Sequence, residues 1–144
     1  MTVETMSRDA SLALLGTGRV GRLGFVAEGE PYVVPMDYVF EEMCIYAHSL
    51  LGHKIRALRG EPRACFQVDR VADDLHWSSV MVHGTYEEIT DPGERLLAYR
   101  KLLLRFPGLT PVEVIEDHGP PHPDVILFRI PVEAVTGVSS GSEL

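Results

Sequence analysis

The chain contains little cysteine and has no long apolar run. Cys44 and Cys65 are the only cysteines among 144 residues, and each lies in an apolar stretch outside any C-x-x-C pair. Reduced, buried thiols therefore explain them better than a disulfide or a metal site. No segment approaches the roughly 18 consecutive apolar residues that a membrane helix needs. Because the first residues also lack the pattern of a secretory signal peptide, we expect a cytoplasmic protein without a membrane span.

Basic residues are scarce as well. Lysine and arginine number 13 against 21 aspartates and glutamates, so the formal net charge is −8 at pH 7. This balance argues against nucleic-acid binding, which usually needs a basic surface. Any bound anion must then be held by a local cluster of cations. The length and the 45% hydrophobic content favour one globular domain over residues 1–144.

Start and stop residues predict three helices. The best-marked helix begins after Asp91, with Pro92 at its first position, and ends at Pro107. The other two are expected between Ser7 and Gly16 and over His53–Arg59. Residues 107–124 are rich in proline and are expected to be irregular. They include His118 and His122, whose separation by two prolines argues against a metal pair.

Apolar runs separated by turn residues predict about six strands, mostly consecutive and therefore antiparallel. The last of them is either a strand pair or one strand bent at Pro131, and the tail from Ser139 is expected to fray. Several strands are apolar on both faces, so a barrel interior would bury one face and a helix or a second subunit the other. We predict a mainly β fold with flanking helices, a small antiparallel barrel that forms dimers. The expected strands are Val20–Val26, Tyr32–Phe40, Met43–His48, Arg63–Arg70, Ser78–Ile89 and Val125–Val138.

The segment Gly16–Gly21 spells G-x-G-x-x-G, but it does not predict a dinucleotide-binding turn. That motif has to follow a strand and open a helix. Here a predicted helix comes first and a strand follows, so the glycines more simply allow the chain to turn from one element into the other.

A candidate phosphate site follows the strand that ends at His48. Ser49 offers a hydroxyl, Gly52 lies in the loop, and Lys54 is a mobile cation at the start of a predicted helix. Backbone amides at a helix N-terminus favour an anion. The basic residues Lys54, Arg56, Arg59 and Arg63 are also compatible with a solvated helix face. The position after a strand end favours the phosphate site.

Two further segments each allow two interpretations, one structural and one as part of a ligand site. In the segment Val34–Asp37, Pro35 removes a backbone donor from a strand, which marks either a bulge or an edge. Backbone groups freed by a bulge could bind the rim of a heterocycle, whereas an edge strand with a proline is simply protected against aggregation. Trp77, which opens a strand with Ser78 and Ser79, is either a core residue or an aromatic wall for a planar ligand.

Five segments in this order and spacing resemble one family, the pyridoxamine 5′-phosphate oxidase-like FMN-binding split barrels, and within it the nitroimidazole-resistance (Nim-type) flavoproteins. The resemblance covers about residues 8–138, which would be the core of the domain. The segments are Arg19–Phe25, Pro31–Tyr38, Ile45–Ser49 with Gly52 and Lys54, Pro62–Asp69, and Trp77–Gly84.

The resemblance implies a six-stranded split β-barrel homodimer with FMN at the subunit interface. Residues His48, Ser49, Gly52 and Lys54 would contact the flavin phosphate. The stretch Pro35, Met36 and Asp37, preceded by Val34, would lie beside the isoalloxazine, and Trp77, Ser78 and Ser79 would also face the flavin. The family commonly has asparagine where this chain has Asp37.

The function that the resemblance implies is a flavin-dependent oxidoreductase that reduces small electron-poor molecules, as a nitroimidazole reductase does. The alternatives are a non-enzymatic flavin-binding or storage protein and a pyridoxamine-phosphate oxidase-like enzyme. FMN is the expected cofactor, ahead of FAD or a deazaflavin, and a related barrel could also bind haem. No catalytic acid, base or nucleophile is identified, and the expected partners are a second copy of the chain and a small-molecule substrate.

Overall fold

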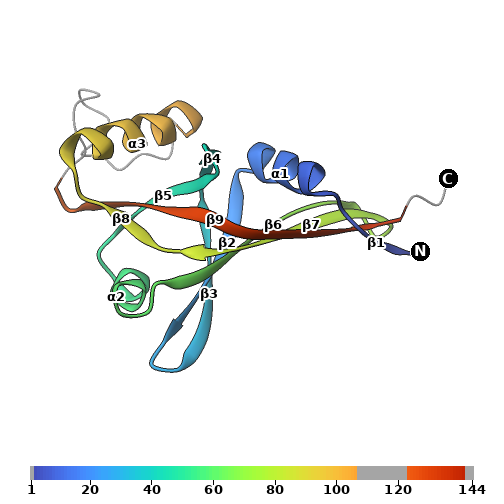
Figure 1. Cartoon of the computed structure of the whole chain (residues 1–144), viewed down its shortest axis with the longest axis horizontal. Helices are drawn as coiled ribbons and strands as arrows, with labels where there is room; N and C mark the ends of the chain where they lie inside the picture. The colour runs from blue at the N-terminus through green and yellow to red at the C-terminus, as the bar shows by residue number, and fades with distance from the viewer. Residues whose placement is uncertain (1, 107–122, 142–144) are drawn as a thin grey trace.

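An antiparallel β-sheet with three helices forms the part of the chain that this computed structural model describes, residues 2–106 and 123–141 (Figure 1). The helices are α1 (Arg8–Thr17), α2 (His53–Gly60) and α3 (Pro92–Arg105). The strands are β1 (Val3–Thr5), β2 (Val20–Ala27), β3 (Glu30–Asp37), β4 (Val39–Glu41), β5 (Cys44–Leu50), β6 (Arg63–Asp73), β7 (His76–Thr85), β8 (Glu87–Ile89) and β9 (Val125–Ser140). No helix in these residues is long and apolar enough to cross a membrane.

The strands follow the order β3-β2-β6-β7-β9-β5-β4, and β1 and β8 add to β9. The sheet therefore has β3 at one end of this path and β4 at the other. Only Tyr38 separates these two strands in the chain, so both ends of the sheet meet at this residue. The expected mainly β antiparallel class is confirmed.

The last element is one long strand, which decides between the two alternatives left open for Val125–Val138. Strand β9 pairs with β5 and β8 before Pro131 and with β7 and β1 after it. The register shifts at Gly84 of β7, where a side chain would collide with the backbone of Pro131. The expected fraying is wrong for Ser139 and Ser140, which pair with Glu4 and Val3 of β1, and residues 142–144 lie outside the described residues.

Nine strands form in the described residues, against the six expected. The expected strand Tyr32–Phe40 divides into β3 and β4, Ser78–Ile89 divides into β7 and β8, and β1 was not expected. At the first break the partner changes, since β3 pairs with β2 while β4 pairs with β5. At the second break both segments pair with β9, but only β7 also pairs with β6. Hydrophobic periodicity reports an extended backbone but not the strand beside it.

The larger core cluster lies between the sheet and the helices α1 and α2. Tyr38 is fully buried within it, and its hydroxyl donates to the carbonyl of Leu15 in α1 over 2.5 Å. Burial raises the pKa of Tyr38 to about 12, so the hydroxyl keeps the proton that it donates. This anchor fixes the corner between β3 and β4. The two cysteines are free and half-buried rather than fully buried.

The helix starts confirm the capping residues predicted from sequence. Ser7 accepts a hydrogen bond from the amide of Ala10, and Asp91 accepts one from the amide of Glu94. Each contact satisfies one of the amides that a helix N-terminus leaves without a partner. Helix α2 differs, because its N-cap residue is Gly52, which has no side chain to accept such a bond. The predicted stop at Pro107 and the pair His118 and His122 lie outside the described residues.

Candidate functional site

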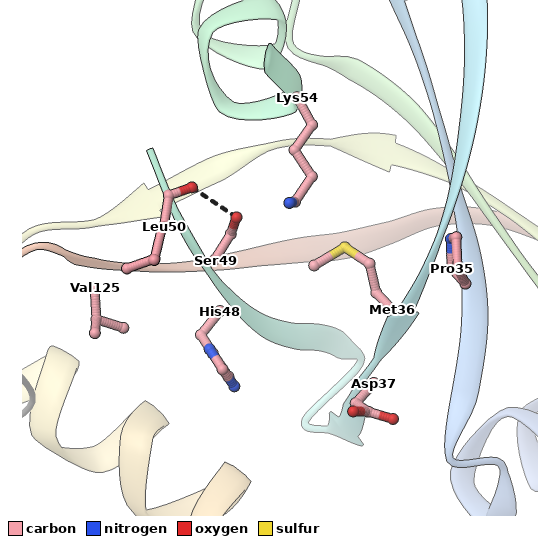
Figure 2. Close-up of a pocket in the computed structure, with 8 residues that line it drawn as sticks. All are labelled: Pro35, Met36, Asp37, His48, Ser49, Leu50, Lys54 and Val125. Carbon is pink, nitrogen blue, oxygen red and sulfur yellow. Dashed lines mark hydrogen bonds between the residues drawn. The ribbon is translucent and has the colours of Figure 1, made fainter. Parts of the chain in front are cut away.

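A cavity of about 270 Å³ opens between β3, β5 and α2 (Figure 2). It forms where β3, which pairs only with β2, separates from β5. Its lining comes from segments far apart in the sequence, which the fold brings together at the two ends of the sheet. The lining residues are Pro35, Met36, Asp37, His48, Ser49, Leu50, Lys54 and Val125.

Lys54 brings a positive charge into this cavity. It is the second residue of α2, and Figure 2 shows its side chain extending from the helix toward Ser49 and Met36. The residue is half-buried, and within residues 2–106 and 123–141 its ammonium group makes no ion pair with a carboxylate. A partly desolvated cation without a counter-ion favours a bound anion.

Ser49 and Gly52 lie beside this cation. Ser49 is buried on β5, and its hydroxyl donates to the carbonyl of Leu50 over 2.7 Å. A hydroxyl can rotate, so the same group can donate to an incoming oxygen instead. Gly52 does not line the cavity; as the N-cap of α2 it leaves the first amides of the helix without a side-chain cap.

The other end of the cavity holds Asp37 and His48. Asp37 is the last residue of β3 and is half-buried, and His48 projects from β5, also half-buried (Figure 2). The cavity therefore has a cation at the helix and a carboxylate and an imidazole at the opposite end. Such an arrangement suits a ligand with an anionic group at one end and hydrogen-bond donors at the other.

Of the four candidate residues in the segment 34–37 of β3, three line the cavity. Pro35, Met36 and Asp37 line the cavity, whereas Val34 packs against the core. Pro35 lies in an edge strand, which is where a proline that lacks a backbone donor is tolerated. The pairing of β3 with β2 shows no register shift, so the edge explains Pro35 and no bulge is present there.

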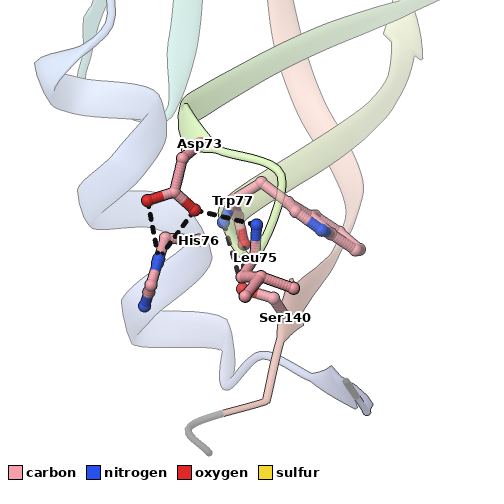
Figure 3. Close-up of polar contacts among 5 residues, drawn as sticks. All are labelled: Asp73, Leu75, His76, Trp77 and Ser140. Carbon is pink, nitrogen blue, oxygen red and sulfur yellow. Dashed lines mark hydrogen bonds and ion pairs between the residues drawn. The ribbon is translucent and has the colours of Figure 1, made fainter.

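The candidates Trp77, Ser78 and Ser79 lie elsewhere. They open β7, and Ser78 pairs with Ser139 of β9, near β1 and away from α2 and β5 in Figure 1. Figure 3 shows the backbone amide of Trp77 donating to the Ser140 hydroxyl, over 3.0 Å. A single copy of the chain does not bring these three residues to the cavity.

The four basic residues in and after α2 do not all face the cavity. Arg59 pairs with Glu88 through two hydrogen bonds of 2.9 Å, and Arg56 is exposed on the helix. The hydrogen bond from Arg59 lowers the pKa of the Glu88 carboxyl. Of the four basic residues, Lys54 alone lines this cavity, so the solvated-face interpretation holds for Arg56 and Arg59.

Leu50 and Val125 also line the cavity, although neither was predicted from the sequence. They face each other in the pairing of β5 with β9, which joins positions 75 residues apart. Leu50 follows Ser49 directly and could have been included with it. Nothing local marks Val125, because its place depends on a long-range pairing.

A comparison with models of known protein families identifies the family of this chain. The model described as pyridoxamine 5′-phosphate oxidase matches residues 7–138 of this chain. The chain belongs to this family. The match confirms the resemblance found in the sequence and covers nearly the same span.

Three relatives illustrate the similarity. A FAD-binding protein from Mesorhizobium loti is 33% identical, with a TM-score of 0.81 over 98% of this chain and 100% of that one. A candidate 5-nitroimidazole antibiotic resistance protein from Bacteroides thetaiotaomicron is 22% identical, with a TM-score of 0.74 over 96% of this chain and 89% of that one, which shows a shared fold. An uncharacterised Rhizobium meliloti protein is 33% identical over 89 residues, 62% of this chain. The match spans 59% of that relative's length.

Proposed function

We propose that the chain binds a flavin nucleotide in the cavity between β3, β5 and α2 and uses it to reduce small electron-poor molecules. The observation that carries the proposal is Lys54, which points into the cavity at the start of a helix and has no carboxylate partner among the residues that the structure describes. It gives a flavin phosphate a counter-charge, as helix starts do for many nucleotides. The relative from Mesorhizobium loti, a FAD-binding protein, supports a flavin as the ligand.

The residues present fit the two ends of such a ligand. Lys54, Ser49 and the uncapped amides of α2 would hold the phosphate. Met36 and Pro35 would pack against the ring system, and Asp37 could accept a hydrogen bond from a ring N–H. A bound flavin supplies the electron transfer, and the protein supplies orientation and the surrounding charge.

The identity of the ligand tests this proposal directly. Purified protein should show a flavin absorbance spectrum, and mass spectrometry should find a flavin released on denaturation. Bleaching under NADH or NADPH, followed by recovery with a nitroaromatic acceptor, would support an enzyme. A flavin that neither reagent affects would favour a carrier or storage protein, and a colourless protein that does not take up added flavin would overturn the proposal.

We also propose that two copies of the chain complete the site. About 270 Å³ is below the range of roughly 300–1,000 Å³ usual for ligand pockets, so one copy would enclose only part of a flavin. Val20, Val26 and Val33 of β2 and β3 are exposed by 40% or more, which leaves apolar surface for a partner. Trp77, Ser78 and Ser79 of the second copy are then candidates for the missing wall.

Light scattering at micromolar concentration should therefore give twice the chain mass of 16.0 kDa. A symmetric pair is the usual way to cover such a surface. The mass of a single chain, measured with bound flavin, would contradict the proposal that a partner completes the site.

A further inference from the structure

Helix α2 carries the proposed phosphate site at one end and an ion pair at the other. The guanidinium of Arg59, in the last turn of the helix, donates to both carboxylate oxygens of Glu88 in β8, over 2.9 Å each. Two parallel hydrogen bonds of this kind fix direction as well as distance. The pair therefore sets how the C-terminal end of α2 is oriented against β8.

The carboxylate of Glu88 is held in turn by Tyr86. The Tyr86 hydroxyl donates to Oε1 of Glu88 over 2.7 Å, and Tyr86 is only 7% exposed. Burial and this hydrogen bond raise the pKa of Tyr86, so the hydroxyl keeps the proton that it donates. The backbone amide of Tyr86 also donates to the carbonyl of Pro62, just after the helix, over 2.8 Å. Tyr86 thus connects the exposed ion pair to the core.

The start of α2 has less directional support. Its N-cap residue, Gly52, offers no side-chain cap. Ile55 and Leu58 bury one face of the helix in the core, and the His53 ring packs edge-on against two neighbouring aromatic rings. Such apolar contacts hold a helix on a surface but are not directional. A helix of eight residues is a rod of about 12 Å, so the ion pair at its far end also sets where Lys54 and the first amides point.

We propose that Arg59 and Glu88 form a positioning pair for the flavin phosphate, which aligns Lys54 and the first amides of α2 and makes the site prefer a phosphorylated flavin to riboflavin. This inference rests on the proposed flavin site and adds two residues that do not line the cavity. Groups that bind a ligand need a supporting shell of contacts to keep their geometry. A purely structural ion pair would stabilise the fold and leave the preference for phosphate unchanged.

A second ion pair on the same strand provides a matched control. Glu87 precedes Glu88 in β8 and pairs with Arg129 of β9 over 3.0 Å. Adjacent residues of a strand point to opposite faces. This pair joins two strands and includes no residue of α2. Its loss therefore removes a comparable ion pair without releasing the helix.

The affinities of flavin-free protein for FMN and riboflavin, measured by calorimetry, test the inference. Glu88→Gln should weaken FMN by about fivefold or more and leave riboflavin unchanged, as expected for groups coupled in one network. Electrostatics alone predicts the opposite sign, because the loss of a carboxylate makes this region more attractive to an anion. Glu87→Gln removes the same charge and should leave the ratio of the two affinities unchanged.

Two milder variants separate geometry from charge and decide the question if Glu88→Gln does not fold. Arg59→Lys keeps the positive charge but cannot form the two parallel hydrogen bonds. It should weaken FMN and leave riboflavin unchanged. Tyr86→Phe removes only the hydroxyl that holds Glu88, and it should act in the same direction to a smaller extent.

The outcomes distinguish this inference from the proposed function. Four results would each overturn the positioning pair and leave the flavin site intact: unchanged FMN affinity in Arg59→Lys, tighter FMN binding in Glu88→Gln, an equal loss of both ligands, or an equal effect of Glu87→Gln. Failure of FMN and riboflavin to bind the unaltered chain would overturn the flavin site and the positioning pair together.

Discussion

Replacement of Lys54 by alanine is expected to weaken FMN binding by about ten- to a hundredfold while leaving riboflavin binding nearly unchanged. Only FMN carries the phosphate that the ammonium group would contact. A hydrogen bond to a charged group contributes roughly 1.5–3 kcal/mol, which corresponds to this range of affinity. Because Lys54 has no carboxylate partner in the described residues, its removal breaks no ion pair that could obscure the effect.

The control for this experiment lies on the same helix. Arg56 also carries a positive charge on α2, but it is exposed and does not line the cavity. Arg56→Ala should therefore change FMN affinity little at 0.15 M salt, where exposed charges are screened. Titration of FMN and riboflavin into each flavin-free variant gives the comparison. If Lys54→Ala weakened both ligands equally, the phosphate would have to lie elsewhere.

The elements of this fold were predictable because their signals are local. Ser7 and Asp91 cap their helices as expected, since a cap depends on residues only three positions apart. Pro35 lies at a sheet edge for an equally local reason, its missing amide. The breaks that separate β3 from β4 and β7 from β8 were not predictable. They depend on distant strands: β3 and β4 join different strands, whereas β7 and β8 both join β9 and only β7 also has β6 beside it.

The same distinction applies to the site. His48, Ser49 and Lys54 were found together because a strand end, a loop and a helix start follow one another in the chain. Val125 was not found, because the pairing of β9 with β5 places it there. Trp77 was grouped with the site through the family resemblance, and one copy of the chain leaves it at a different part of the sheet. Its role stays a prediction about the dimer.

Replacement of Asp37 by asparagine is expected to raise the reduction potential of the bound flavin by several tens of millivolts. Asp37 lines the cavity at the end opposite the start of α2, where the ring system would lie. A carboxylate there repels the negative charge that a flavin gains on reduction. At ~5 Å and an effective dielectric of ~20, this repulsion is on the order of 3 kcal/mol. Solvent reduces it, since Asp37 is only half-buried.

For a two-electron couple, about 30 mV corresponds to 1.4 kcal/mol, so even half of the unscreened repulsion shifts the potential by roughly 30 mV. Asparagine keeps the size of the side chain and removes the charge. Glu30→Gln, at the exposed far end of β3, removes the same charge outside the cavity and should leave the potential unchanged. Spectroelectrochemical titration at pH 7 compares the three proteins. Superimposable potentials for Asp37→Asn and the unaltered chain would show that this carboxylate does not act on the flavin, and that its place in the cavity serves packing or hydrogen bonding instead.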